Sequence, residues 1–537
     1  MRPFLRRLVL ITALAAQTVL LFGQVEPRVA RDAWLQNASP LQRVSKLAPR
    51  TLLSIAADTS NWKALETGLS GYGEALATRD SALFVGGIFM TAGGQPSQGI
   101  ALWNGYWSGV GGGTNGFVYA VAVRGNDVYV AGQFTLVGGS ISANNIARWD
   151  GSAWHALSNG LTSTGGGAYI LTLAFRDTIL FVGGSFNRAG SLAANNLARW
   201  NGVTWDTVAG APAGTVSALA VNANDLYVGG AFTSAGSVPQ THHLARWNGS
   251  QWFDIGGGTN NTVVAIAFQG SDVLVGGFFD TVGTVRARSI GRWTGTTWQG
   301  VGYGLANCVN SIVPQTDGTI FAGGNFNYKY TATDSTPIGY VAAWRNGEWQ
   351  PLESGLNGPA NAIVYDRGDL YVTGYFTTAG GKSVNGIAVY REKTETSYLQ
   401  GWNLASMPRL ARSTATDDVF PTAQGIYRYT SQGYSRPTTI EFGRGYWAYY
   451  AAPTVNAVYG SNADSASVTA ASGNSWILIG GLTLPASVSV ITSTPPNSFG
   501  QVFGYSGTAY TQTVTLEPGR GYWLYIMQPC TIHIVGH

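Results

Sequence analysis

Short apolar runs recur through the middle of the chain, and each ends in two small residues, one variable residue and a phenylalanine. These phenylalanines are Phe89, Phe134, Phe186, Phe232, Phe279, Phe326 and Phe376. Successive members lie 45, 52, 46, 47, 47 and 50 residues apart. A period of roughly 40 to 50 residues made of short strands is typical of a propeller blade. The pattern therefore predicts an all-β chain whose central part is a seven-bladed β-propeller.

The second repeat shows four strands. Residues 118–123 alternate between apolar and polar positions and predict the innermost strand, and residues 128–132 predict the next one. A loop of about ten residues then leads to a third strand at residues 146–149. Asp150-Gly151 follows as a hairpin turn, because both residues accept the positive φ that a tight turn needs. An outermost strand carrying Trp154 completes the predicted blade.

Tryptophan pairs indicate how the ring closes. Six repeats carry two tryptophans near the third and fourth strands, whereas the seventh stops at Tyr390. The missing strand is present at the other end of the chain, where residues 61–65 read like residues 348–352. We therefore expect the propeller to span residues 59–391, with residues 59–66 completing the last blade. Such closure leaves only short, protected sheet edges.

Two sequence signatures stand at fixed places in the repeat: the glycine pair before phenylalanine, as in residues 183–186, and the Leu-Ala-Arg-Trp run of residues 197–200. On these motifs the chain resembles kelch-like secreted β-propeller repeats. It is similar to fungal bud-site cortical marker propellers and to uncharacterised secreted bacterial propellers. The resemblance implies the propeller fold and leaves the activity open, because propellers host unrelated functions.

The period breaks near Thr394, where a second domain is predicted. We expect a linker at residues 392–400 and a C-terminal β domain at residues 401–537 with internal repeats at 401–453 and 475–529. The repeats share the sequence Gly-Arg-Gly-Tyr-Trp at residues 443–447 and 519–523. Alternating runs predict two related β subdomains or one pseudo-twofold β-sandwich. The domain is similar to tryptophan-rich modules at the ends of secreted bacterial proteins, which implies presentation or attachment at the cell surface.

The amino-terminal residues predict export. Arg2, Arg6 and Arg7 precede an apolar stretch at residues 8–22, which is typical of a signal peptide over residues 1–23. Residues 24–58 have few strand signals, and we expect an irregular arm there. The apolar stretch at residues 8–22 is too short for a good membrane span. The mature chain is therefore expected to be secreted or associated with the cell surface, without a membrane span.

Composition and charge fit an exported β protein. The 537 residues include 73 glycines and 18 tryptophans, and only 11% are charged, which suits many short strands and tight turns. Loss of the three amino-terminal arginines takes the net charge from +4 to +1, so no nucleic-acid partner is expected. Cys308 and Cys530 are the only cysteines. No disulfide framework is expected, and a single bridge between the two stays open.

Several acidic residues occupy repeated positions. They precede the repeat phenylalanine by seven residues at Asp127, Asp225, Asp272 and Asp369, and by nine at Asp80, Asp177 and Asp317. An acid at the same turn of each blade indicates turn formation, because aspartate bonds its own backbone there. Glu441 and Glu517 share one place in the C-terminal repeats. We expect no catalytic residue among them, although acids distant in sequence can converge in space.

Metal and cofactor chemistry is also not expected. His242 and His243 are adjacent, so on a strand they point to opposite faces and do not make a two-ligand site. No cysteine stands beside a tyrosine in the way the kelch-fold copper enzyme galactose oxidase would require. The arginines Arg148, Arg199, Arg246 and Arg292 recur at one place. We expect them to stack on neighbouring rings or to bond the adjacent blade.

The sixth repeat departs from the others. Its interval from Phe326 to Trp344 is 18 residues, where the other repeats have 14 or 15. The extra length carries Tyr328, Lys329 and Tyr330, which are the predicted binding residues, because loops on a rigid scaffold often carry function. The sequence favours a noncatalytic propeller that binds an extracellular protein or glycan. The alternative is a carbohydrate-active lyase or hydrolase with its site on one propeller face.

Overall fold

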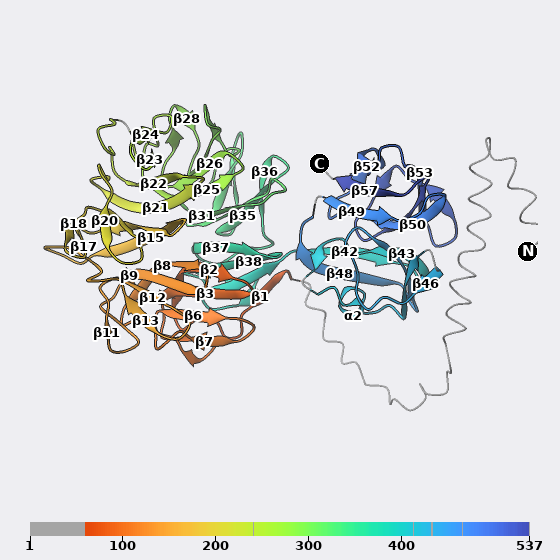
Figure 1. The fold of residues 1–537 in the computed structure, drawn as a ribbon, viewed down its shortest axis with the longest axis horizontal. Helices are drawn as coiled ribbons and strands as arrows, with labels where there is room; N and C mark the ends of the chain where they lie inside the picture. The colour runs from red at the N-terminus through yellow and green to blue at the C-terminus, as the bar shows by residue number, and fades with distance from the viewer. Residues whose placement is uncertain (1–59, 240, 412, 431–432, 464, 536–537) are drawn as a thin grey trace, which may run out of the picture. The chain divides into compact units, whose positions relative to one another are not determined.

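A computed structural model describes residues 60–239, 241–411, 413–430, 433–463 and 465–535 (Figure 1). Within these residues the chain forms two compact units, residues 60–390 and residues 391–535. The signal peptide expected at residues 1–23 and the arm expected at 24–58 lie outside the described residues. No described helix is long and apolar enough to cross a membrane.

The first unit contains seven four-stranded antiparallel sheets, and each is one blade of a β-propeller. The innermost strands are β2 (Tyr72–Arg79), β8 (Phe117–Arg124), β15 (Tyr169–Arg176), β21 (Thr215–Asn222), β25 (Val263–Gln269), β31 (Val309–Pro314) and β37 (Ala360–Asp366). The second strands are β3 (Ala82–Ile88), β9 (Asp127–Gln133), β16 (Ile179–Ser185), β22 (Asp225–Ala231), β26 (Asp272–Gly277), β32 (Ile320–Gly324) and β38 (Asp369–Gly374).

The outer half of each blade is shorter. The third strands are β6 (Ile100–Trp103), β12 (Ile146–Trp149), β19 (Leu197–Trp200), β23 (Leu244–Trp247), β29 (Ile290–Trp293), β35 (Val341–Arg345) and β41 (Ile387–Arg391). The outermost strands are β7 (Trp107–Gly109), β13 (Trp154–Ala156), β20 (Trp205–Thr207), β24 (Trp252–Asp254), β30 (Trp298–Gly300), β36 (Glu348–Pro351) and β1 (Trp62–Ala64). In the second blade, all four strands lie where the apolar pattern predicts them.

The segment between the second and third strands, expected to be a plain loop, forms a small hairpin in most blades. These hairpins are β4 (Thr91–Ala92) with β5 (Gln95–Pro96), β10 (Leu136–Val137) with β11 (Ile141–Ser142), β17 (Arg188–Ala189) with β18 (Leu192–Ala193), β27 (Thr281–Val282) with β28 (Val285–Arg286), β33 (Tyr328–Tyr330) with β34 (Ser335–Pro337), and β39 (Thr378–Ala379) with β40 (Lys382–Ser383). In the third blade, β14 (Leu161–Thr162) also pairs with β17. Two-residue strands are too short to leave a periodic signal in the sequence.

The innermost strands form a closed ring. Each packs against the next in chain order, and β37 packs against β2. The last blade is completed by β1, which pairs antiparallel with β41 and places Trp62 opposite Tyr390. The amino-terminal strand therefore closes the propeller, as the sequence predicts.

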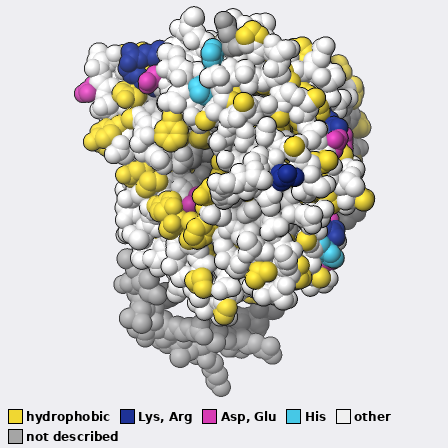
Figure 2. All heavy atoms as spheres, turned by 90° about the vertical axis from the view of Figure 1, so that its left-hand side faces the viewer, with side chains coloured by type: hydrophobic (Ala, Val, Ile, Leu, Met, Phe, Trp, Pro, Cys, Tyr) yellow, Lys and Arg dark blue, Asp and Glu magenta, His cyan; other side chains and the backbone are white. Residues whose placement is uncertain are grey.

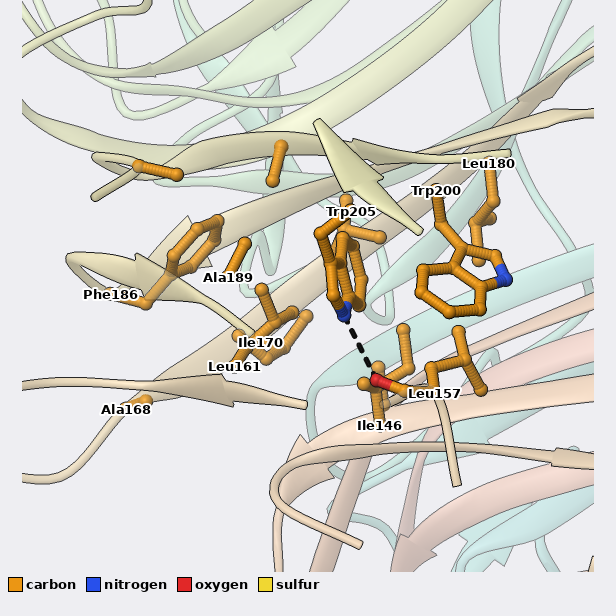
Figure 3. Close-up of a cluster of buried hydrophobic side chains, with 14 of the residues drawn as sticks. Ile146, Leu157, Leu161, Ala168, Ile170, Leu180, Phe186, Ala189, Trp200 and Trp205 are labelled. Carbon is orange, nitrogen blue, oxygen red and sulfur yellow. Dashed lines mark hydrogen bonds between the residues drawn. The ribbon is translucent and has the colours of Figure 1, made fainter. Parts of the chain in front are cut away.

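One tryptophan from each outermost strand joins its blade to the preceding one. In Figure 3, the indole nitrogen of Trp205 donates a hydrogen bond of 2.9 Å to the carbonyl of Leu157 in the blade before it. The same bond closes the ring, because the Trp62 indole nitrogen donates to the carbonyl of Leu352 at 3.0 Å. Both tryptophans are buried. The repeated tryptophan is thus a junction between blades.

The repeated small residues lie where the chain has no room for a side chain. A Cβ added at Gly183 would lie 2.5 Å from Val216 in the next blade, and one added at Gly184 would lie 2.1 Å from the Tyr169 carbonyl. Such distances are far below ordinary carbon contacts. The pair therefore lets neighbouring strands and blades approach closely, which explains why small residues precede the repeat phenylalanine.

The second unit consists of two related halves. The first half contains β42 (Lys393–Tyr398), β43 (Gly401–Ser406), β44 (Leu410–Ala411), α2 (Thr416–Val419), β45 (Gly425–Thr430), β46 (Gly433–Ser435), β47 (Gly445–Tyr450) and β48 (Thr454–Ser461). The second contains β49 (Ser465–Ala470), β50 (Ser475–Gly480), β51 (Ala486–Ser487), η2 (Val488–Val490), β52 (Ile491–Thr494), β53 (Phe499–Tyr505), β54 (Tyr510–Gln512), β55 (Thr515–Leu516), β56 (Gly521–Ile526) and β57 (Cys530–Val535).

Each half has one three-stranded sheet and one four-stranded sheet, and the second half also has the two-stranded sheet β51-β55. The orders are β42-β48-β44 and β43-β47-β45-β46 in the first half, and β49-β57-β52 and β50-β56-β53-β54 in the second. The segment expected as a linker at residues 392–400 instead contains β42, which pairs along its whole length with β48. Its sequence is mostly polar and its partner is about sixty residues away, so the local pattern does not reveal it.

An aromatic cluster joins the two halves. The ring of Trp447 meets Tyr505 edge to face at 5.1 Å between centroids, and Trp523 meets Tyr429 in the same way at 5.1 Å. The contacts are reciprocal, because each tryptophan packs against a tyrosine of the other half. The halves therefore share one core and form a pseudo-twofold unit.

The paired glutamates expected to be structural occupy equivalent turns. The backbone nitrogen of Glu441 donates to the Tyr446 hydroxyl at 2.7 Å, and that of Glu517 donates to the Tyr522 hydroxyl at 2.6 Å. Both turns therefore rest on a tyrosine hydroxyl from the following strand, and the equivalence extends the pseudo-twofold relation to single hydrogen bonds.

Candidate functional site

The lengthened hairpin of the sixth blade contains the three predicted binding residues. Tyr328, Lys329 and Tyr330 form β33, which pairs with β34. Lys329 makes a β-bridge with Leu305, and the equivalent bridge in the first blade is made by Ala92. A lysine therefore occupies a place that a small buried residue takes in a sister blade.

Two of these three side chains are used within the propeller. The Lys329 ammonium donates a hydrogen bond of 2.5 Å to the Trp349 carbonyl and lies 3.8 Å from the carboxylate of Glu348. The guanidinium of Arg288 lies 3.8 Å from the ring centre of Tyr330. Tyr328, in contrast, is 42% exposed. The structure thus leaves Tyr328 the most available of the three, and a binding role for this hairpin stays a prediction.

A second candidate lies at the beginning of the innermost strands, where all seven contain a β-bulge. The residues at the bulges are Glu74, Tyr119, Leu171, Ser217, Val264, Asn310 and Asn361. Each is half-buried, whereas the residue before it is buried. A bulge redirects a side chain and often lies beside a functional site. Because the innermost strands form the ring, these seven side chains lie at one level of it.

Glu74 is the one charged residue at this level. The Asn361 amide nitrogen donates to its Oε2 at 3.0 Å, and the Tyr375 hydroxyl donates to its Oε1 at 3.3 Å. Asn361 also donates to the Gly73 carbonyl at 3.1 Å, which orients the amide toward β2. The rings of Tyr72 and Tyr375 pack on each other with centroids 3.7 Å apart. Glu74 therefore lies among one amide and several phenol groups.

The electrostatics of this place disfavour a negative charge. Burial raises the pKa of Glu74 from 4.5 to about 7, and the hydrogen bond from Tyr375 opposes the rise only in part. Burial, and then the nearby Glu74 carboxylate, raises the pKa of Tyr119. No described lysine, arginine or histidine contributes to the pKa of Glu74. The carboxyl group thus lacks a compensating positive charge among the described residues.

Exposed aromatic side chains surround the same end of the ring. Phe117 and Tyr169 begin innermost strands, and Phe278 and Tyr375 directly follow second strands; each is between 40% and 48% exposed. Figure 2 shows the end of the propeller that carries β17 and β18, where apolar side chains gather around a hollow with an acidic side chain inside it. This end of the ring, formed by Glu74, Asn361 and the surrounding aromatic residues, is called the channel mouth below.

The repeat motifs that end in phenylalanine do not include Glu74, yet the sequence contains a signal for it. Glu74 precedes Phe89 by 15 residues, and the other repeats have Tyr, Leu, Ser, Val or Asn at the equivalent place. Glu74 is thus a charged exception to the repeat. The length of the sixth hairpin is a more visible exception, and it indicates Tyr328 instead.

The repeated aspartates are structural, but partly in a different way from the one expected. Asp127 and Asp225 bind the arginine of the same blade: Arg148 lies 3.1 Å from Asp127, and Arg246 lies 2.7 Å from Asp225. Asp317 shows the expected bond to local backbone, accepting from the Thr319 nitrogen at 2.9 Å. The expectation of backbone bonding is therefore wrong for the first two, because a strand partner brings a guanidinium within reach.

The repeated arginines mainly form ion pairs within their own blades. Arg199 pairs with Asp206 and also lies 5.9 Å from the ring centre of Trp247 in the next blade. Arg246 lies 4.5 Å from the ring of Phe253. Stacking on rings thus accompanies the ion pairs, which join the second and third strands or the third and fourth.

The structure provides no evident metal or redox centre in the part of the chain that it describes. No group of three His, Cys, Asp or Glu residues there is placed to hold a metal ion. His155 bonds Asp150 at 2.6 Å, and His243 bonds the Gly230 carbonyl at 3.1 Å. Cys308 and Cys530 are buried free thiols, and burial raises the pKa of Cys308 to about 12. Neither thiol is suited to act as a thiolate.

No protein-family profile matches the chain, and no curated protein matches it. Among solved structures, the computationally designed Ika8 protein shares 15% identity over 61% of this chain and 99% of its own, with a TM-score of 0.37. The WD40 β-propeller domain of Doa1 shares 15% identity over 61% of this chain and 96% of its own, with a TM-score of 0.38.

PorZ, an essential bacterial surface component of the type-IX secretion system of Porphyromonas gingivalis, is a further similar structure. It shares 11% identity over 74% of this chain and 60% of its own, with a TM-score of 0.41. The seven four-stranded sheets themselves, rather than these similarities, identify the fold as a β-propeller.

Proposed function

We propose that the chain is a secreted, noncatalytic propeller of the kelch-like type that binds an extracellular protein or glycan, in adhesion or surface scaffolding. The observation that carries the proposal is the channel mouth, where exposed aromatic side chains surround a half-buried carboxyl group. Concave sites lined by aromatic side chains with a few convergent polar groups are typical of ligand binding. The closed ring keeps these groups in fixed positions.

The surroundings of Glu74 argue for binding rather than for hydrolysis. Glycoside hydrolysis canonically uses two carboxyl groups, roughly 5 to 10 Å apart. The described groups that bond Glu74 are the Asn361 amide and the Tyr375 hydroxyl, and no second carboxylate contributes to its pKa. A single carboxyl group held by an amide and a phenol is better suited to recognise a ligand than to cleave one.

The remaining parts of the molecule support the same role. The exposed Tyr328 of the sixth hairpin, with Lys329 and Tyr330 supporting it, offers a second contact for a large ligand. The C-terminal unit has its own compact aromatic core, and we assign to it the presentation or attachment of the propeller at the cell surface.

The alternative function is that of a carbohydrate-active lyase or hydrolase. One observation favours it: the pKa of Glu74 is raised to about 7, which is near the value that suits a general acid at neutral pH. The tyrosines Tyr72, Tyr119 and Tyr375 would then be candidates for contacting the sugar.

A screen that reads retention and product release together separates the two functions. The purified chain is immobilised and exposed to glycans, polysaccharides and extracellular proteins. The proposal predicts retention of at least one ligand without cleavage. Turnover that is lost in Glu74→Gln would establish the enzyme instead, and no retention of any ligand would contradict a binding function.

A further inference from the structure

We propose that the channel mouth recognises a primary ammonium group on an apolar stem, as presented by a lysine side chain of a protein partner, with the ammonium held by Glu74. This inference rests on the proposed binding function and names its ligand chemistry. The argument uses the charge of the site, the shape of its rim and the groups that face Glu74.

Charge complementarity points to a cation. Glu74 is half-buried and accepts hydrogen bonds from neutral donors, Asn361 and Tyr375. Burying a carboxylate without a cationic partner is unfavourable. A bound anion would add repulsion, and a neutral ligand would remove water without supplying charge. A bound ammonium group compensates the carboxylate, and nearby aromatic rings also attract cations.

The rim favours an organic cation over a metal ion. Calcium prefers six to eight oxygen ligands, whereas Glu74 is the one carboxylate at the bulge level of the described ring. Phe117, Tyr169 and Tyr375 present exposed aromatic surface above it. Lysine buries its methylene stem along apolar surface while its ammonium reaches a polar partner.

The side chains that face Glu74 are three tyrosines and one asparagine. Tyr72 lies on its own strand, Tyr119 on β8, Asn361 on β37, and Tyr375 follows β38; β3 contributes no ionisable side chain. Arg79, Arg124 and Asp366 end their strands, roughly 16 Å away at the rise of a β-strand. Burial also raises the pKa of Tyr119 and Tyr375 above the ordinary tyrosine value. Between pH 5.5 and 8, the ionisation of Glu74 therefore dominates.

The test is calorimetric titration of the full chain with Nα-acetyl-lysine N-methylamide, at pH 5.5 and pH 8. Lysine stays charged over this range. If the ammonium binds only the ionised carboxyl group, affinity rises by roughly thirtyfold from pH 5.5 to 8, given a pKa of about 7. Binding near pH 6.5 should also release a proton, seen as a dependence of the heat on the buffer.

Two controls make the result specific. The norleucine analogue has the same stem without the ammonium and should bind at least tenfold more weakly to the wild-type chain. Glu74→Gln should lose the lysine probe, whereas Glu66→Gln, a change at an exposed carboxylate of the same propeller, should keep it. The norleucine and pH measurements need no variant, so they remain decisive if Glu74→Gln does not fold.

The outcomes distinguish this inference from the function on which it rests. Equal binding of lysine and norleucine analogues, binding without pH dependence, or no binding of the lysine probe would overturn the ammonium site. Glucosamine binding in place of the lysine probe would assign the ammonium to an amino sugar and also contradict the stated ligand. Retention of another ligand in the earlier screen, unaffected by Glu74→Gln, would leave the binding function intact.

Discussion

Each innermost strand presents one half-buried side chain at its bulge, at the same level of the ring. Most are neutral, but Glu74 is a carboxyl group whose pKa burial raises to about 7. Lys329 shows the opposite case, because it departs from the repeat and yet serves the blade through its bond to the Trp349 carbonyl. A departure from the repeat is therefore a candidate site only after its contacts are known.

The hairpin of the sixth blade gives a prediction at this scale. Lys329→Ala should lower the free energy of unfolding by about 1 to 2 kcal/mol, because it removes a charge-assisted hydrogen bond from a partly buried carbonyl. Tyr328→Ala, in the same hairpin, should change it by less than about 0.5 kcal/mol, since that ring is exposed. Urea unfolding of both variants checks this. Equal costs would show that Lys329 does not support the blade.

At the scale of elements, the repeated tryptophans are the junctions of the ring. Each bonds a carbonyl of the preceding blade, as Trp107 does with Leu65 at 2.9 Å and Trp62 with Leu352 at 3.0 Å. The second bond spans most of the sequence of the propeller. The short strand β1 therefore contributes to stability out of proportion to its three residues.

Replacement of the closing tryptophan tests this junction. Trp62→Ala should destabilise the propeller by about 3 to 5 kcal/mol, because it removes a fully buried aromatic side chain and its hydrogen bond. Trp205→Ala is the matched control, with an equivalent bond of 2.9 Å between two blades that do not involve β1. Thermal unfolding should give similar losses. A negligible effect at Trp62 beside a full effect at Trp205 would mean that β1 does not close the ring.

The ring could be predicted from the sequence because every blade repeats the same pattern of strands and packing residues. Strand alternation, the glycine pair and the tryptophans gave the blades and their closure through Trp62. It missed β42, whose residues are mostly polar and whose partner β48 is distant in sequence. It also missed Glu74, because a bulge interrupts the alternation from which side-chain direction is inferred.

At the scale of the whole molecule, the channel mouth exists only when the ring is closed. Glu74 lies on the first innermost strand, and its partners Asn361 and Tyr375 come from the last blade. A change that opens the ring at β1 should therefore also separate Glu74 from both partners. Stability and ligand binding depend on the same closure, although Glu74 itself lowers the stability as the pH rises from about 4.5 to 7.

The pH dependence of stability in wild type and Glu74→Gln tests the central claim most directly, because it requires no ligand. Below pH 4.5 the carboxyl group is protonated in both folded and unfolded chains and carries no penalty. As the pH rises toward and through about 7, the unfolded chain ionises first. The wild-type chain should therefore lose on the order of 3 kcal/mol relative to Glu74→Gln by pH 8.

Thermal and urea unfolding from pH 4.5 to 8 measures this difference, with Glu66→Gln, at an exposed carboxylate of the propeller, as the control that should follow the wild type. The account predicts that Glu74→Gln is the more stable protein at pH 8 and nearly equal to wild type at pH 4.5. Parallel stability curves for wild type and Glu74→Gln would contradict an uncompensated carboxyl group at the channel mouth.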